Sequence, residues 1–300
     1  MAIPGVASAH ATARYRQRCN ASCHPHHFRP FQDLWVSSIG LGTYLGDADD
    51  ATDALTRDAI RTAIASGCNV LDTAINYRCQ RSERVIGATL EELITTGVVA
   101  REELLICTKG GYLPFDGAVP REPTRYLLDT LIRPGLAPYD EIVAGCHCLS
   151  PTYLDHALTT SLRNLRLETI DLYYLHNPEQ QLDEVSRDTF LTRLEAAIAW
   201  CEQSVHNGRI RAWGLATWNG LRCNPASKEA LSLEQLMGLA ERVGGPTHHF
   251  RAIQLPYNLA MPEAFSFRNQ TVQAESLTVL EAAARLGLCV VVSASLLQGQ

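Results

Sequence analysis

The feature that most constrains the fold is a regular alternation of short apolar runs with longer segments of helical periodicity. Seven runs rich in aliphatic residues occur at residues 37–44, 69–74, 103–110, 170–176, 210–217, 252–258 and 288–294. Segments in which apolar residues recur at helical spacing lie near 55–64, 85–94, 153–165, 190–206, 228–243 and 275–286. Nearly unbroken apolar runs are typical of strands covered on both faces. The pattern therefore predicts parallel strands, each followed by a helix.

Seven strand–helix units of this spacing fit an α/β chain of the (β/α)8 TIM-barrel class better than an open sheet. An open nucleotide-binding sheet would carry GxGxxG after its first strand, and the glycines of GLGTYLG (40–46) are spaced differently. The seventh strand ends just before Gln300. We therefore expect a C-terminally truncated barrel over residues 36–300 that lacks the eighth unit.

The N-terminal segment has a different composition from the rest. Residues 1–32 contain no Asp or Glu, and their arginines lie among Ala, Ser and Thr. We expect residues 1–35 to form an N-terminal extension that is disordered or loosely attached, although the composition is also compatible with an organellar transit peptide. The ten scattered cysteines favour reduced thiols and a cytoplasmic location.

Composition and charge exclude several classes of partner. The net charge of −6 argues against a nucleic-acid binder, and no run reaches the roughly 18 apolar residues of a membrane helix. CNASCHPHH (19–27) and CHC (146–148) hold potential metal ligands, but each group lies in one short stretch, whereas structural zinc sites join separated ligand pairs. We expect no metal site, and the sequence leaves the oligomeric state open.

Four ionisable side chains fall at or just after successive strand ends. Asp72 is near the end of the second run and Tyr77 follows that run, Lys109 is near the end of the third run, and His176 ends the fourth. In a barrel these ends meet on one face, which is the face that carries active sites. One such residue alone is more often structural, but four at neighbouring strand ends predict a functional site.

The residue types indicate the chemistry. A free tyrosine has a pKa near 10, and a lysine ammonium beside it would favour the phenolate and lower that pKa. A carboxylate beside the lysine would keep the ammonium charged, and a neutral imidazole could polarise a carbonyl oxygen. This set suits proton delivery to an oxygen that becomes an alcohol. Because these residues supply no electrons, the reaction needs a hydride donor.

The chain resembles the aldo-keto reductase family from about residue 36 onwards. The resemblance rests on GLGT (40–43), LDTAINY (71–77), RSERVIG (81–87), TKG (108–110), SLRNLRLETIDLYYLHNP (161–178), GRIRAWGLA (208–216) and QLPYN (254–258). It implies that Tyr77 is the general acid–base, that Lys109 paired with Asp72 tunes its pKa, and that His176 orients the carbonyl. It also implies NADPH or NADH as the cofactor, bound without a Rossmann fold.

Further site residues follow from the resemblance. The expected cofactor contacts are Gly42, Thr43, Thr217, Asn219, Gln254, Ser295 and Leu297. Ala216 and Thr217 stand where many family members have Ser-Asn, and the tyrosine that usually stacks on the nicotinamide after strand seven is absent. Trp213 or Trp218 could replace that ring. Tyr44 and Tyr112 follow strands one and three and are expected to line the substrate pocket.

The leading hypothesis is an NAD(P)(H)-dependent oxidoreductase that acts on a small aldehyde, ketone or the matching alcohol. Two alternatives stay open. The chain could be a cofactor-binding regulatory subunit or an inactive fragment with little turnover. Within enzymes, it could be an NAD-dependent sugar or alcohol dehydrogenase.

Overall fold

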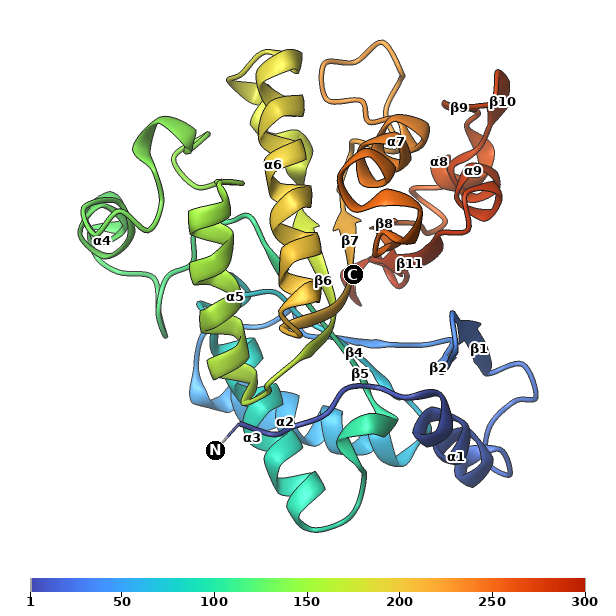
Figure 1. Ribbon diagram of the computed structural model, residues 1–300. Coiled ribbons are helices and arrows are strands. Elements are labelled where there is room, and N and C mark those ends of the chain that lie inside the picture. Colours follow the sequence, from blue (N-terminus) through green and yellow to red (C-terminus); the bar gives the residue numbers. More distant parts are fainter. Residues whose placement is uncertain (1, 300) are drawn as a thin grey trace.

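The computed structural model describes residues 2–299 and contains a curled, parallel, seven-stranded sheet with helices on its outside (Figure 1). The strands are β3 (Leu41–Gly42), β4 (Val70–Asp72), β5 (Leu105–Gly110), β6 (Ile170–His176), β7 (Ile210–Ala216), β8 (Phe250–Pro256) and β11 (Cys289–Ser293). They are hydrogen-bonded in the order β3-β4-β5-β6-β7-β8-β11, so the order of the strands in the sheet is their order along the chain. This is the (β/α)8 barrel arrangement with seven of its strands, as the sequence predicted.

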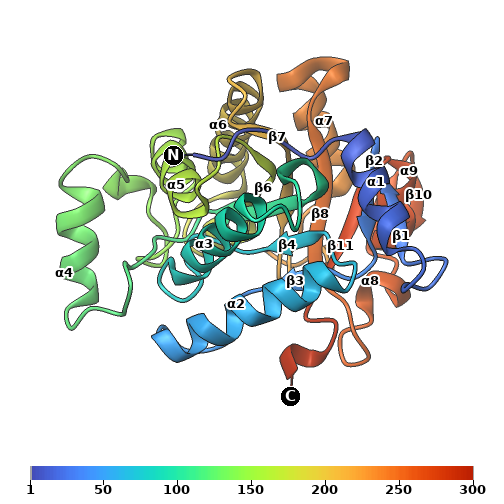
Figure 2. The ribbon, with the colours of Figure 1, turned by 90° about the horizontal axis from the view of Figure 1, so that it is seen from below.

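Helices follow six of these strands and surround the sheet when it is seen from below (Figure 2). They are α2 (Asp50–Ala65), α3 (Arg81–Thr95), α5 (Pro151–Leu165), α6 (Arg187–His206), α7 (Leu233–Gly244) and α9 (Val279–Arg285). Five begin at a side chain that accepts a backbone N–H of the first turn, namely Asp49, Ser150, Ser186, Ser232 and Thr278. Gly67, Gly208 and Gly287 end three of them with positive φ, as expected for C′ glycines.

Smaller elements fill the connections. They are α1 (Ala9–Cys19), β1 (Phe28–Phe31), β2 (Leu34–Ser37), α4 (Pro123–Leu127), α8 (Glu263–Ser266), β9 (Gln270–Val272) and β10 (Glu275–Leu277). A five-residue π turn at Leu128–Ile132 extends α4, and short 3-10 helices lie at Arg101–Glu103, Tyr139–Glu141, Pro178–Asp183, Gly245–Thr247 and Leu297–Gly299. The predicted strand 37–44 is reduced to β3, because Gly40 and Gly42 interrupt its apolar run at the edge of the sheet.

The expectation that residues 1–35 are disordered or loosely attached is wrong for the described part of this segment. Helix α1 buries Tyr15, whose hydroxyl donates to the carbonyl oxygen of Ile64 at 2.5 Å. Phe31 and Leu34 of the antiparallel β1–β2 hairpin pack against alternate residues of β5 to β8. Each such burial stabilises the fold by about 1.5–3 kcal/mol.

The absence of Asp and Glu from residues 1–32 suggested a loosely attached segment, but the arginines of this segment find their partners elsewhere in the chain. Arg14 and Arg18 both pair with Glu103, at 3.2 and 2.9 Å, so their counter-ion lies outside the segment. The backbone N–H of Ala7 donates to Asp171 Oδ1 at 2.6 Å, across 164 residues of sequence. The composition of residues 1–32 alone cannot predict contacts with partners so distant in sequence.

The sheet does not close within residues 2–299. β3 pairs only with β4, and β11 pairs only with β8. The two edges therefore face the gap that an eighth strand fills in a closed barrel. Across the same residues, no helix combines the length and apolar character that crossing a lipid bilayer requires.

Candidate active site

The four ionisable residues predicted from the strand ends lie together at the carboxyl ends of the strands. Asp72 is the last residue of β4, Lys109 the last but one of β5, and His176 the last of β6. Parallel pairing of these three neighbouring strands brings their carboxyl ends side by side. Tyr77 lies in the loop after β4, and its ring packs edge to face on that of His176, with centroids 5.9 Å apart.

Lys109 and Asp72 form a buried ion pair. The ammonium Nζ lies 2.5 Å from Asp72 Oδ1 and also donates to the carbonyl oxygen of Thr73 at 2.8 Å. The lysine side chain is 1% exposed and that of the aspartate 18%. Burial alone would lower the pKa of Lys109, but Asp72 and Tyr77 outweigh it and hold the pKa above its ordinary value. Lys109 is therefore a permanent cation at neutral pH.

Tyr77 lies beside this cation, with Lys109 Nζ 4.8 Å from the centre of the phenol ring. The ammonium favours the phenolate, as predicted. Burial has the larger effect, however, and it raises the pKa of Tyr77 above the ordinary value. The expected net lowering is therefore wrong, and Tyr77 carries its proton at neutral pH, which is the state required of a general acid.

His176 is an uncharged imidazole. Burial lowers its pKa well below the ordinary value, and the nearby Lys109 ammonium and His147 lower it further. Its Nδ1 is buried without a hydrogen-bond partner among the described residues. A neutral imidazole carries one N–H that it can donate to a substrate oxygen.

His147 supports His176 and was not recognised from the sequence as part of the site. Its Nε2 lies 2.8 Å from the main-chain oxygen of His176, and Gln181 Nε2 lies 2.9 Å from its Nδ1. Because the amide donates to Nδ1, the imidazole proton lies on Nε2 and is donated to His176. His147 and Cys148 belong to the CHC stretch that holds potential metal ligands, and both are fully buried. The sequence alone could not predict that His147 donates to the main-chain oxygen of His176, 29 residues further along the chain.

Both predicted pocket tyrosines flank the centre. The ring of Tyr44 is exposed and packs edge to face on that of Tyr77 at 5.1 Å. The ring of Tyr112 packs in the same way on that of His176 at 5.0 Å. The Tyr112 hydroxyl accepts from Asn177 Nδ2 at 3.0 Å and lies 3.2 Å from Gln180 Oε1.

The predicted cofactor contacts at the end of β3 and within β8 lie close to Asp72. Gln254 Nε2 donates to Asp72 Oδ2 at 2.9 Å, and the backbone N–H of Thr43 donates to the main-chain oxygen of Asp72 at 3.1 Å. A Cβ added at Gly42 would meet nothing within 4 Å, so there is open space beside this strand end. Ser295 and Leu297 lie in the turn after β11, and both are exposed.

The predicted contacts after β7 are engaged by another residue. Thr217 Oγ1 donates to Glu179 Oε1 at 2.6 Å, and the backbone N–H of Asn219 lies 3.2 Å from the same oxygen. Sequence reasoning missed Glu179, because its partners lie about 40 residues further along the chain. The suggestion that Trp213 could stack on a nicotinamide is wrong, because it is fully buried and stacks on Phe250 at 4.6 Å. Trp218, which is 40% exposed, stays available.

A turn of unusual backbone conformation follows Tyr77. Arg78, Cys79 and Gln80 have φ values of 49°, 56° and 70°, in the left-handed region that non-glycine residues rarely adopt. Arg78 is buried and donates to the main-chain oxygens of Asp47 and Asp49 at 2.7 and 3.2 Å. This arginine therefore ties the loop that carries Tyr44 to the loop that carries Tyr77.

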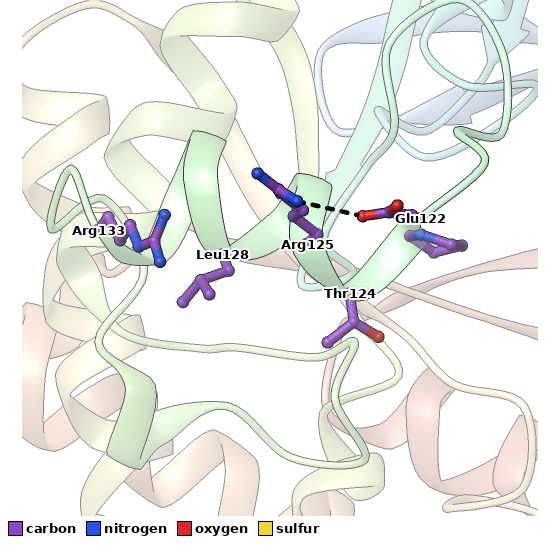
Figure 3. A pocket seen from close by; sticks show the side chains of 6 residues that line it. Glu122, Thr124, Arg125, Leu128 and Arg133 are labelled. Atoms are coloured by element: carbon purple, nitrogen blue, oxygen red, sulfur yellow. Dashed lines mark ion pairs between the residues drawn. The ribbon is translucent and has the colours of Figure 1, made fainter.

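A surface hollow of about 620 Å³ lies away from this centre, along α4 and the turn after it (Figure 3). Its lining residues are Glu122, Pro123, Thr124, Arg125, Leu128 and Arg133. Glu122 and Arg125 form an ion pair of 3.7 Å across one side. The hollow belongs to the segment between β5 and α5, and none of the four ionisable residues lines it.

Comparisons with known proteins identify the family and the fold. The model of the Aldo/keto reductase family matches residues 38–296. The 6-dehydroglucose reductase of Novosphingobium aromaticivorans is 26% identical over 185 residues, which cover 61% of this chain and 48% of that protein. Aldo-keto reductase family 1 member C13 of Mus musculus is 27% identical over 143 residues, covering 48% and 32%. The chain thus matches about half or less of the length of these curated relatives.

Solved structures show the same fold. The glycerol dehydrogenase of Gluconobacter oxydans has a TM-score of 0.58 at 21% identity, covering 92% of this chain and 65% of that one. An aldo/keto reductase of Klebsiella pneumoniae, solved with NADP and acetate, has a TM-score of 0.54 at 20% identity, covering 88% and 66%. The family model spans most of the residues that form the sheet and its site. The chain therefore belongs to the aldo/keto reductase family.

Proposed function

We propose that this chain is an NAD(P)(H)-dependent oxidoreductase that interconverts a small aldehyde or ketone and the matching alcohol. The observation that carries the proposal is Tyr77 held between the buried Lys109–Asp72 pair and the uncharged His176. Structural neighbours solved with NADP or NADPH support the choice of cofactor. The free cysteines support a reducing, cytoplasmic location.

The residues around the strand ends fit a nicotinamide. Gly42 leaves open space next to Asp72, and Thr217, Gln254 and Ser295 bring polar groups to neighbouring strand ends. When bound there, a reduced nicotinamide supplies the hydride that the protein's own side chains lack.

The chain's own residues supply and control the proton. His176 donates its N–H to the carbonyl oxygen and orients it, and Tyr77 transfers its phenolic proton to that oxygen as the alcohol forms. The phenolate that remains is stabilised by the Lys109 ammonium, and Asp72 keeps that ammonium charged and in place. Oxidation of an alcohol uses the same groups in reverse, with Tyr77 as the base.

The test is turnover of a panel of aldehydes, ketones and alcohols by the purified protein with NADPH and NADH. Tyr77→Phe removes only the acidic proton. It should lower kcat by about 10²–10⁴-fold, the usual contribution of a general acid–base, while the cofactor Kd, measured by fluorescence, changes little. Tyr139→Phe, which removes the hydroxyl of an exposed tyrosine in the 3-10 helix Tyr139–Glu141, is the matched control and should keep most of the activity. If Tyr77→Phe turned over as fast as the wild type, the assignment of the acid would be overturned.

The substrate class is a finer proposal. Two similar proteins are named for a sugar derivative and for glycerol, which supports polyhydroxylated carbonyls or alcohols as the substrate class. The alternative of an NAD-dependent sugar or alcohol dehydrogenase shares this substrate class. Catalytic efficiency with sugar, polyol and simple aldehyde substrates, compared with NADH and NADPH, separates that alternative from an NADPH reductase.

A second candidate function is a cofactor-binding protein or an inactive fragment with little turnover. The open sheet edge between β3 and β11 favours it, since Ser295 and Leu297 lie beside that edge. Tight binding of NADPH or NADH without turnover of any member of the panel would support a binding protein. An insoluble 300-residue chain would support an inactive fragment.

A further inference from the structure

A second surface hollow, of about 550 Å³, lies on the outside of the sheet where helices α3 and α5 pack together (Figure 2). We call it the arginine hollow, and its lining residues are Arg84, Asp116, Arg163, Asn164 and Arg166. Among the described residues, none of those assigned to the strand-end site lines it. Its volume is in the range of small-molecule sites, and three of its lining residues are cations in a chain of net charge −6. The hollow is therefore a candidate anion site, separate from the place assigned to the nicotinamide.

The buried part of the lining is an amide that ties the two helices together. Asn164 is 6% exposed, and its Nδ2 donates to Glu83 Oε2 at 2.9 Å and to Gln80 Oε1 at 3.1 Å. A Cβ added at Gly87 would lie 2.3 Å from the main-chain oxygen of Asn164, so the two helix backbones are in direct contact. Asn164 Oδ1 then accepts from Arg84 Nε at 3.3 Å. This contact orients the guanidinium of Arg84 from a rigid base.

The three guanidinium groups differ in their partners. Arg84 is paired with Asp116 at 2.7 Å, and Arg166 is paired with Glu91. Arg163 is exposed, and its side chain has no ion-pair or hydrogen-bond partner among residues 2–299. The side chain of Asp116 is 54% exposed and belongs to the loop after β5, so water reaches its pair with Arg84. The hollow thus offers one unpaired guanidinium and a second whose carboxylate an incoming anion can displace.

A purely structural explanation covers only part of this cluster. Arg163 and Arg166 lie at the C-terminal end of α5, where cations complement the helix dipole without any ligand. Arg84 lies near the start of the 15-residue helix α3, where the dipole favours anions and disfavours cations. Asn164 and Asp116 nevertheless hold its guanidinium there, beside the other two. An anion shared by these groups accounts for a cation kept at an unfavourable helix end.

We propose that the arginine hollow binds a phosphate group, either as inorganic phosphate or as the phosphate monoester of a small molecule. A guanidinium presents its N–H groups in a planar fork that matches two phosphate oxygens. Arg84 and Arg163 bind these oxygens, Asp116 moves from Arg84 into solvent, and Arg166 adds positive charge beside them. The inference goes beyond the proposed oxidoreductase function and does not depend on it, because no residue of the strand-end site takes part.

The experiment measures the Kd of the purified chain for two probes by isothermal titration calorimetry, in Tris chloride without nicotinamide cofactor. The probes are inorganic phosphate and phenyl phosphate, a monoester without the carbonyl or alcohol group that the strand-end site would act on. The wild type should bind at least one of them with a Kd of about 1 mM or below. Tighter binding of inorganic phosphate identifies the free ion as the ligand, and tighter binding of the ester identifies a phosphorylated small molecule.

Three variants of exposed side chains test the assignment of the hollow. Arg163→Gln removes the unpaired guanidinium and should raise the Kd about fivefold, the upper end of the range for a solvent-exposed ion pair. Asp116→Asn removes the competing carboxylate and should lower the Kd by about threefold. Arg57→Gln removes the same charge from the exposed surface of α2 and is the matched control, so it should leave the Kd unchanged.

The outcomes separate this inference from the proposed function. If the wild type binds neither probe with a Kd below about 10 mM, the inference is overturned whether or not the chain reduces carbonyls. Equal weakening by Arg57→Gln and Arg163→Gln overturns it as well, because the attraction would then be that of an adventitious ion to the charge of the whole surface. A wild-type Kd in Arg163→Gln would place the phosphate elsewhere, for instance among the strand ends. An unchanged Kd in Asp116→Asn would contradict the displacement of that carboxylate.

Discussion

At the residue scale, the site depends on buried imidazoles that stay uncharged. His147 donates to the main-chain oxygen of His176 and accepts from Gln181. Burial lowers the pKa of His147 from its ordinary value of 6.5 to about 4. A protonated His147 would carry an N–H on both ring nitrogens, and the one at Nδ1 would face the Gln181 amide donor. The hydrogen bonds that place His176 therefore require the neutral form.

This pKa predicts how stability depends on pH. Between about pH 4 and 6.5 the unfolded chain holds a proton on His147 that the folded chain lacks, so the free energy of unfolding falls as the pH is lowered through this window. The full loss from this side chain is about 3 kcal/mol. His147→Gln keeps an N–H for the His176 carbonyl but does not titrate. Its stability curve, measured by urea unfolding, should therefore be flatter than that of the wild type by about this amount.

The control for this prediction is His10→Gln, which removes an exposed imidazole near the start of α1. Its stability should follow the wild-type pH dependence. Parallel curves for His147→Gln and wild type between pH 4 and 6.5 would contradict the prediction, because they would show that folding does not keep His147 uncharged in this range.

At the scale of elements, the turn after Tyr77 stores strain that its contacts must offset. Three consecutive non-glycine residues in the left-handed region cost about 1–2 kcal/mol each. Arg78, the first of them, has a side chain only 1% exposed and binds Asp53 as well as the loop carbonyls. Gln80, the last, donates to the main-chain oxygen of Phe115 at 3.0 Å. Contacts to both neighbouring loops thus hold Tyr77 at a fixed distance from β4.

Removing the guanidinium tests this account. Arg78→Met keeps much of the side-chain volume and removes the hydrogen bonds, so we expect the free energy of unfolding to fall by about 2–3 kcal/mol, the worth of one or two bonds to a charged group. Arg61→Met, which removes an exposed ion pair with Glu92, should cost less than about 1 kcal/mol. Chemical denaturation measures both. Equal costs for the two variants would mean that Arg78 does not hold the turn.

At the scale of the whole molecule, the sequence predicted those features that are determined by residues close together in the chain. The runs that form β5 to β8 are apolar because both faces are covered, and this cause is visible in the run itself. The four strand-end residues could be identified because the barrel places all such ends together. Hairpin β1–β2 could not, since Phe31 and Leu34 owe their places to strands more than 60 residues away. Glu179 was missed for the same reason.

The open sheet predicts unequal protection across the molecule. β5, β6 and β7 each have hydrogen-bonded neighbours on both sides, whereas β3 has two residues and one neighbour, and the partly exposed β11 also has one within the described residues. Amides of β5 to β7 should therefore exchange with deuterium only on global unfolding. Amides of β3 and β11 should exchange through local opening, faster by orders of magnitude.

Hydrogen exchange followed by mass spectrometry checks this gradient and links it to the cofactor. Ser295 and Leu297 directly follow β11, so their proposed contacts would tie the loose edge to a bound nicotinamide nucleotide. Saturating NADPH or NADH should then slow exchange over residues 289–298 and leave the rates in β6 unchanged, because β6 is already limited by global unfolding. Equal exchange in β11 and β6 without cofactor would show that the sheet unfolds as one unit. Unchanged exchange over 289–298 with cofactor bound would remove Ser295 and Leu297 from the binding site.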